Sequence, residues 1–140
     1  MGETRLWVDI CVITVLGIMS VVALTIIIER YFYIKKIDVR EFSSLDELEG
    51  SLTDYMNLLA SIGSNAPYVG MLGTVLGIMS TFHEMGLNSS ANAKGVMEAL
   101  SQALFATALG LVVAIPTIFI YNLLLRKVKK KVIAWKVLNG

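Results

Sequence analysis

The sequence has few of the residues on which catalytic, metal-binding or disulfide-stabilised proteins depend. Its 140 residues include one cysteine, Cys11, and one histidine, so no intramolecular disulfide can form. The histidine, His83, has no second histidine, cysteine or close aspartate at a ligand spacing, which argues against a metal site. No P-loop, CxxC or HExxH motif is present, and the net charge of +1 gives no indication of nucleic-acid binding. We therefore expect no cofactor, no metal, no nucleic-acid partner and no enzymatic activity.

Charged residues are also scarce, and long apolar runs take their place. Hydrophobic residues make up 56% of the chain and the mean hydropathy is +0.71, which is typical of a single membrane-embedded domain, here residues 1–140. The first run, residues 6–28, is long enough to cross a bilayer and ends at a charged and aromatic boundary cluster, residues 29–33. It has no small-x-small cleavage site near its end, so we interpret it as a retained span rather than a signal peptide.

One charged residue, Asp9, interrupts this first run. It lies within the first turns, where interfacial water can solvate a carboxylate. We interpret Asp9 as an end-of-helix residue at the membrane interface, and a proton-carrying aspartate inside the membrane is the alternative.

The last apolar run, residues 99–125, has no charged residue and exceeds the roughly 30 Å bilayer core if helical. Small or weakly polar residues recur along it at helical spacing: Ala99, Ala103, Thr107, Gly110, Ala114, Thr117 and Tyr121. The opposite face suits hydrocarbon: Phe105, Leu109, Val112, Val113, Ile120 and Leu123. A long apolar helix with one small-residue face is typical of helices that pack together inside a membrane.

The middle of the chain repeats this pattern. We expect one helix from Leu52 onward, with a kink near Pro67 and a span over residues 66–84. Its own small-residue series is Gly63, Ala66, Gly70, Thr74, Gly77 and Thr81, with Gly73 beside it. The two series predict close helix contacts through Gly70, Gly73, Gly77, Ala103, Gly110 and Ala114.

The hydrophilic segment, residues 29–65, carries two helix N-cap signatures, one beginning at Ser44 and one at Ser51. Gly50 lies between them, so we expect a short acidic helix followed by the start of a long one. The acidic residues are most simply a solvated face, and a docking surface for a partner is the alternative.

The distribution of basic residues predicts the orientation. Four follow the first span (Arg30, Lys35, Lys36 and Arg40), and six lie in the tail, residues 126–140 (Arg126, Lys127, Lys129, Lys130, Lys131 and Lys136). Only Arg5 precedes the first span, and only Lys94 lies in the predicted outer loop, residues 85–98, which begins with a turn at Asn88-Ser89-Ser90. The positive-inside rule therefore places the N-terminus outside and the tail in the cytoplasm, where it can also touch anionic lipid.

Each small-residue series carries a threonine near mid-span, Thr74 in one and Thr107 in the other. An isolated threonine in a helix usually bonds to its own i−4 carbonyl. Here both share the glycine side, which Thr117, Tyr121 and Asn122 continue towards the cytoplasm. A ring of such subunits would enclose a cavity lined by hydroxyl groups. Because no carboxylate lies mid-membrane, a proton pathway would need one from a partner.

Two segments resemble the second- and third-span motifs of the ExbB/TolQ family. The first reads APYVGMLGTVLGIM, residues 66–79. The second reads ALFATALGL, residues 103–111, and continues into Ala114-Ile115-Pro116 and Ile120-Tyr121-Asn122. Together the motifs are highly specific, and the ExbB branch is the more similar.

The resemblance implies a pentameric ring in the bacterial inner membrane, with the helices of an ExbD-like single-span protein in its pore. Such a complex uses the proton motive force to energise a TonB-like protein and, through it, outer-membrane import. Thr74 and Thr107 would line the pore and face the partner's aspartate. A TolQ-type subunit of the Tol-Pal envelope-integrity system is the alternative within the family. A four-span flagellar stator subunit fits less well, and a passive membrane scaffold is the alternative from another class.

The chain departs from the family pattern at Gln102, where the resemblance implies a glutamate. Gln102 cannot ionise, and Glu98 lies one turn further out on the same helix face. We expect Glu98 to supply the acidic character at the outer mouth of the pore and Gln102 to form hydrogen bonds there. The alternative is that Glu98 only favours the N-terminal end of its helix. The cytoplasmic loop is also much shorter than in many family members.

Overall fold

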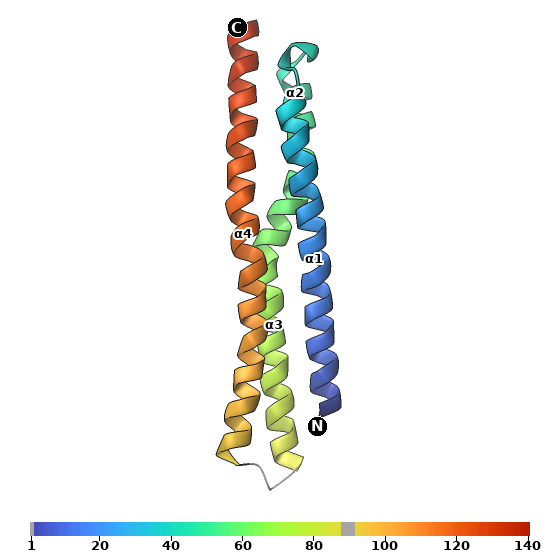
Figure 1. The fold of residues 1–140 in the computed structure, drawn as a ribbon, viewed down its shortest axis with the longest axis vertical. Helices are drawn as coiled ribbons and strands as arrows, with labels where there is room; N and C mark the ends of the chain where they lie inside the picture. The colour runs from blue at the N-terminus through green and yellow to red at the C-terminus, as the bar shows by residue number, and fades with distance from the viewer. Residues whose placement is uncertain (1, 88–91) are drawn as a thin grey trace.

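The computed structural model describes residues 2–87 and 92–140, and within them the chain is built from helices. The elements are α1 (Gly2–Lys36), the short 3-10 helix η1 (Val39–Glu41), α2 (Leu45–Leu52), α3 (Met56–Leu87) and α4 (Ala93–Asn139). Figure 1 shows three long helices running side by side, with α2 at the end of the molecule that holds the C-terminus. The predicted all-α fold is confirmed.

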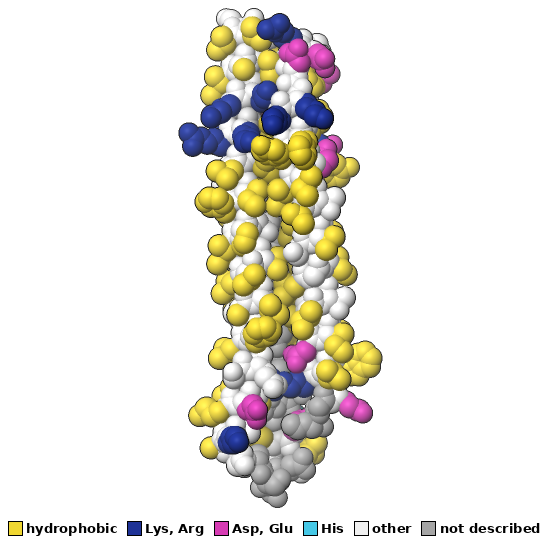
Figure 2. Space-filling view, in the orientation of Figure 1, with side chains coloured by type: hydrophobic (Ala, Val, Ile, Leu, Met, Phe, Trp, Pro, Cys, Tyr) yellow, Lys and Arg dark blue, Asp and Glu magenta, His cyan; other side chains and the backbone are white. Residues whose placement is uncertain are grey.

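Two of the long helices, α1 and α4, are long and apolar enough to cross a membrane. Helix α3 has no charged residue from Met56 to Leu87 other than Glu84, but its glycines and polar residues lower its hydropathy. Figure 2 shows a central zone of hydrophobic and uncharged side chains, with lysine and arginine gathered towards the α2 end. The molecule therefore has the charge distribution of a membrane protein, with two candidate spans identified by length and composition.

Helices α3 and α4 form an antiparallel hairpin, and α1 packs against both of them. Pro67 lies inside α3. Figure 1 shows the green part of α3 crossing towards α4 before the helix continues along it. The predicted turn at Asn88-Ser89-Ser90 lies outside the described residues. Both helices extend into the predicted outer loop, because α3 continues to Leu87 and α4 begins at Ala93, capped by the Asn92 side chain.

A hydrophobic core lies at the end of the molecule that holds α2, and we call it the α2-end core. Its fully buried side chains come from α1, α2, α3 and α4: Ile34, Leu48, Leu52, Leu59 and Leu124. The predicted tail, residues 126–140, is the last part of α4 and belongs to this region. The indole N–H of Trp135 donates to the carbonyl of Phe42 at 3.1 Å, and Lys131 donates to the carbonyl of Ile37 at 3.3 Å.

Arg30 is buried in this region, with only 4% of the residue exposed. Its guanidinium group pairs with Glu29, donates to the carbonyl of Ser51 at 2.7 Å and lies over the ring of Tyr33. The hydroxyl groups of Tyr33 and Ser51 are also hydrogen-bonded. A buried charge is tolerated only with such partners, and these tie the end of α1 to α2.

One of the two predicted helix starts is confirmed and the other is wrong. Ser44 caps α2, with its side chain accepting from the backbone N–H of Glu47 at 3.2 Å. Ser51 does not begin the next helix, and Gly50 does not separate two helices, because α2 continues through both to Leu52. The buried side chains of Leu48 and Leu52 hold α2 together across Gly50. Helix α3 begins at Met56, after Tyr55 with a φ of 62°.

Candidate functional site

Helices α3 and α4 meet through backbone atoms, in a contact we call the α3–α4 seam: Gly70 and Gly77 on α3 against Ala103 and Gly110 on α4. A Cβ atom added to Gly70 would lie 2.6 Å from the carbonyl oxygen of Ala106. One added to Gly110 would lie 2.7 Å from the carbonyl oxygen of Ala66. No side chain fits at these distances, so the seam requires glycine at both positions.

The six small residues predicted at helix contacts are all buried: Gly70, Gly73, Gly77, Ala103, Gly110 and Ala114. They do not all face the same neighbour. A Cβ added to Gly73 would meet Val12 of α1 at 2.9 Å and Ala106 of α4 at 3.0 Å. Gly73 therefore lets α1 pack closely against α3 and α4. The contact between α3 and α4 is made by Gly70, Gly77, Ala103 and Gly110.

The two mid-span threonines lie side by side in the seam. Thr74 donates to the carbonyl of Ala103 at 2.8 Å and is hydrogen-bonded to the hydroxyl of Thr107. Its contact with the i−4 carbonyl of Gly70 is longer, 3.3 Å. The preferred partners of Thr74 are thus on the other helix, unlike those of an isolated membrane threonine. Both threonines are half-buried.

The threonine pair faces away from α1. Gly73 lies against Val12, and Ala106 belongs to the same buried cluster as Val12; each comes one position before a threonine. Because a helix turns by about 100° per residue, Thr74 and Thr107 point more than a quarter turn away from the side that meets α1. We call the side to which they point the threonine side. In the single chain two neighbours on this side, Met71 and Leu111, are 51% and 42% exposed, and the threonine pair keeps part of its surface accessible.

A groove of about 480 Å³ continues the threonine side towards the α2 end. Pro67, which lines it, precedes Thr74 by seven residues, and Leu111 follows Thr107 by four, so each lies on the same helix face as its threonine. The polar side chains in the groove are Ser64 and Asn122. Asn122 was predicted from the sequence. Ser64 was not, although its spacing to Pro67, Met71 and Thr74 is helical.

The other two predicted polar residues are used locally. Thr117 is buried and donates to the carbonyl of Val113, its own i−4 residue, at 2.7 Å. Tyr121 is half-buried and packs against the α2-end core. Neither joins the threonine pair, which lies about 15 Å further along α4 from Thr117 at 1.5 Å per residue.

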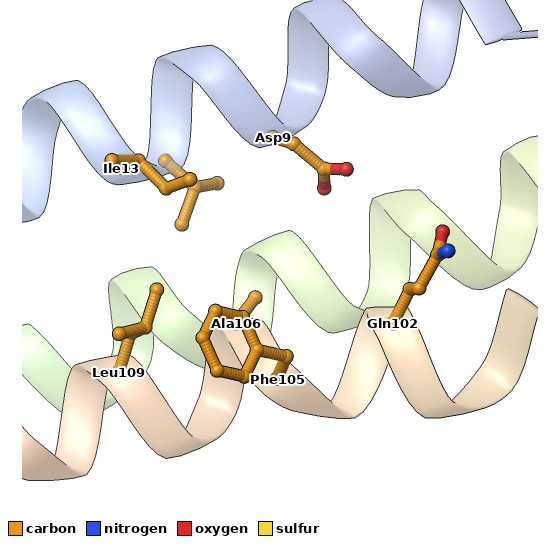
Figure 3. Close-up of a pocket in the computed structure, with 7 residues that line it drawn as sticks. Asp9, Ile13, Gln102, Phe105, Ala106 and Leu109 are labelled. Carbon is orange, nitrogen blue, oxygen red and sulfur yellow. The ribbon is translucent and has the colours of Figure 1, made fainter.

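Gln102 and Glu98 lie on the opposite side of α4 from the threonine pair. Gln102 is one turn from Ala106 on the same face, and it lines a pocket between α1 and α4 together with Asp9 (Figure 3). Glu98 is exposed, one turn further out. The structure therefore brings Gln102 together with Asp9, and it does not bring Gln102 or Glu98 to Thr74 and Thr107.

Arg5 links the three long helices at the end of the molecule away from α2, and sequence reasoning missed this role. It donates to the carbonyl of Ala99 on α4 at 2.6 Å and to the hydroxyl of Thr81 on α3 at 3.2 Å. The signal available in the sequence was a single arginine just before a membrane span. Its partners lie more than 70 residues away, and only the packing of the helices identifies them.

Comparison with known proteins identifies the family. The model of the MotA/TolQ/ExbB proton channel family matches residues 35–137. Biopolymer transport protein ExbB of Aquifex aeolicus is 46% identical over 140 residues, which cover 100% of this chain and 95% of that protein. Biopolymer transport protein ExbB of Helicobacter pylori is 51% identical over 127 residues, 91% of this chain and 88% of that protein.

A longer relative matches half of this chain. Biopolymer transport protein ExbB of Salmonella typhimurium is 44% identical over 70 residues, half of this chain and 29% of that protein. The family match and the two full-length relatives agree with the resemblance carried by residues 66–79 and 103–111. The chain belongs to the MotA/TolQ/ExbB proton channel family, as a member of its ExbB group.

Proposed function

We propose that this chain is the ring-forming subunit of a proton-driven inner-membrane motor of the ExbB–ExbD type, which energises TonB-dependent import through the outer membrane. The observation that carries the proposal is the hydrogen-bonded pair of Thr74 and Thr107. It lies in an uncharged stretch of both helices, on the side of the seam that α1 leaves free.

Hydroxyl groups suit this role because each can donate and accept a hydrogen bond. With the Thr74 hydroxyl donating to Ala103 and the Thr107 hydroxyl donating to Thr74, the pair can accept from a protonated carboxyl group, and a turn of the Thr107 O–H would let it donate to an ionised one. The chain has no charged residue between Met56 and His83 or between Ala99 and Leu125, so the titrating group in the pore comes from a partner. That partner is an ExbD-like single-span protein whose aspartate faces the threonines.

The ring is a pentamer with the threonine sides turned inward. The groove that contains Ser64 and Asn122 then continues the pore lining towards the cytoplasm, and Thr117 and Tyr121 lie beside it. The faces that carry Phe105 and Val112, 60% and 66% exposed in the single chain, meet lipid or a neighbouring subunit. Glu98 and Gln102 lie at the end of α4 away from α2, on the side of the helix opposite the threonine pair, so the exposed Glu98 would act as an acid at the outer rim of the ring rather than on the pore lining.

The membrane arrangement has three spans, residues 6–28, 66–84 and 99–125. The N-terminus lies in the periplasm and the α2 end in the cytoplasm, since the basic residues gather at the α2 end (Figure 2). In this arrangement the basic tail lies next to anionic lipid headgroups. A neutral central zone between two hydrated ends supports it.

The test removes each hydroxyl group and keeps the side-chain shape. In a strain that lacks the native gene, Thr74→Val and Thr107→Val should lower TonB-dependent siderophore uptake roughly tenfold, the effect of about 1.4 kcal/mol. Thr25→Val is the matched control: Thr25 is exposed on α1 and bonds only to its own i−4 carbonyl, at 2.8 Å. It should leave uptake unchanged.

The same strains separate the ExbB role from the TolQ role. Loss of siderophore uptake with intact resistance to detergent supports the TonB-linked function. Loss of detergent resistance with normal uptake would assign the chain to the Tol system. Wild-type uptake in both valine variants, with the proteins present in the membrane, would contradict the proposed role of the threonine pair.

A further inference from the structure

The pocket between α1 and α4 contains the chain's own candidate for a titrating group. It has a volume of about 170 Å³ and is lined by Asp9, Gln102 and five apolar residues: Val12, Ile13, Phe105, Ala106 and Leu109. Figure 3 shows the Asp9 carboxyl group and the Gln102 amide extending into the space between the two helices. Asp9 is the one charged residue of the apolar run 6–28, and an ionisable residue in such a run is a functional candidate.

The nearest cation does not fully neutralise Asp9. The Nε atom of Arg5 lies 4.0 Å from the Asp9 carboxylate, beyond ordinary hydrogen-bonding distance. The other nitrogens of this guanidinium group donate to Thr81 and Ala99. Arg5 is therefore held by α3 and α4, and the Asp9 side chain, which lines the pocket, is 37% exposed.

Other charged groups around the pocket are few. On α4, Glu98 lies one turn outward of Gln102 on the same face. Helix α3 has no charged residue before its outer end, where His83 and Glu84 lie. On α1, Glu3 is exposed in the first turn. The Asp9 carboxyl group thus faces one cation at 4.0 Å and otherwise neutral walls.

Gln102 suits a partner that changes its protonation state. Its amide has two N–H donors and a carbonyl acceptor, so it can donate to a carboxylate or accept from a carboxylic acid. We infer that Asp9 is a proton-binding site opening into the α1–α4 pocket, with Gln102 as its hydrogen-bonding partner. A proton from water on the outer side bonds to a carboxylate oxygen of Asp9, and it returns to water when the group ionises again.

The site is separate from the threonine pair. Gln102 precedes Thr107 by five residues, about 7.5 Å along α4, and it faces α1 rather than the threonine side. Proton binding by Asp9 does not depend on the proposed function. Its use as an outer loading site for the motor does, and the two are tested separately.

The first test is chemical and needs neither transport nor a partner. Dicyclohexylcarbodiimide, an apolar reagent, modifies carboxyl groups that are protonated in apolar surroundings. In membranes that contain the full chain, mass spectrometry should find the adduct on Asp9, and the labelled fraction should fall as the pH is raised. Asp9→Asn should lose the adduct, and the control Glu3→Gln should keep it. Gln102→Leu should change the labelled fraction at a fixed pH, because the Asp9 carboxyl group loses its hydrogen-bonding partner.

An unlabelled Asp9 at every pH, or an adduct on Glu98 instead, would overturn the inference. An unchanged labelled fraction in Gln102→Leu would remove Gln102 from the site. These results are independent of uptake, so they stand whether or not Thr74→Val and Thr107→Val lower it.

The second test concerns the role in the motor. Asp9→Asn should lower uptake at least as much as Thr74→Val. The double variant Asp9→Asn/Gln102→Glu, which moves the carboxyl group across the same pocket, should restore it. Normal uptake in Asp9→Asn would overturn the loading role. So would a double variant that stays as defective as Asp9→Asn while both proteins are present at the wild-type level.

Discussion

The α3–α4 seam and the α2-end core pack in opposite ways. In the seam, a Cβ atom on Gly70 would lie 2.6 Å from a backbone oxygen of α4, so the helices touch through their backbones. In the α2-end core, large side chains fill the space, and Leu48, Leu52 and Leu59 have no exposed surface. The proposed membrane arrangement accounts for the difference: water drives leucine side chains into a core, whereas lipid gives no such drive and favours close approach of helix backbones.

The buried polar groups of the two regions also differ: those of the seam are neutral, and one at the α2 end is charged. The seam holds a pair of neutral hydroxyl groups, Thr74 and Thr107, which bond to each other. The α2 end buries a charged group, Arg30, with a carboxylate, a carbonyl and an aromatic ring around it. Burying a charge costs less free energy where several polar partners surround it and water is close. The neutral pair leaves the middle of α3 and α4 free of charge, as the proposed pore requires.

The largest expected effect comes from filling the seam. Gly70→Leu should cost more than about 3 kcal/mol, the upper end of the usual range for overpacking, because the atom it meets belongs to the backbone of α4 and cannot rotate away. The measurement is the fraction of monodisperse protein after purification in detergent. Gly17→Leu is the control, since nothing lies within 4 Å of a Cβ added to Gly17. Equal yields of the two variants would contradict the close approach of α3 and α4.

The next largest effect comes from removing a large buried side chain from the α2-end core. Leu52→Ala should lower the free energy of unfolding by about 2–5 kcal/mol, as for other buried leucines. Leu58→Ala, at a side chain that is 47% exposed, should cost far less. Thermal unfolding of the detergent-purified protein measures both, and equal midpoints would show that the α2-end core does not hold the molecule together.

The smallest effect comes from the same substitution made once in the region exposed to water and once in the proposed membrane span. Gly50 lies inside α2 with open space around it, so Gly50→Ala should stabilise the protein by about 0.5–1 kcal/mol in water. Gly17→Ala makes the same change on an exposed position of α1 within the proposed span. We expect a smaller gain in stability there. In lipid the backbone N–H and C=O groups of α1 must be hydrogen-bonded within the helix whichever residue stands at position 17, so alanine adds less. A larger rise in thermal midpoint for Gly17→Ala would contradict this assignment.

Much of the seam could be predicted from the sequence, because small residues at helical spacing have few uses other than close packing. The burial of Gly70, Gly77, Ala103 and Gly110 follows directly from their period. The period does not say which neighbour each residue meets. Gly73 turned out to receive Val12 of α1, and the direction of Gln102 towards α1 depended on where α1 packs.

The hydrophilic segment was predicted less well. A local rule identified Ser44 as a cap because its partner, the Glu47 N–H, is three residues away. The same rule was wrong at Ser51, whose carbonyl and hydroxyl groups are used by Arg30 and Tyr33 of α1. Arg5 was missed for a similar reason, since its partners lie on α3 and α4. Contacts between segments far apart in the sequence determine the roles of Ser51 and Arg5, and a local sequence pattern cannot predict such contacts.

The most direct test of the central claim, that the threonine side faces a water-filled cavity in the assembled ring, is thiol accessibility at Thr74. The chain is expressed alone in a Cys11→Ser background, and Thr74→Cys is treated in membranes with a small water-soluble thiol reagent. Thr25→Cys, exposed on α1, is the matched control. We expect Thr74→Cys to react, Thr25→Cys to stay unreacted, and co-expression of the pore partner to protect Thr74→Cys. Reaction at Thr25→Cys with none at Thr74→Cys would show that the threonine side faces lipid or protein instead, and would contradict the account.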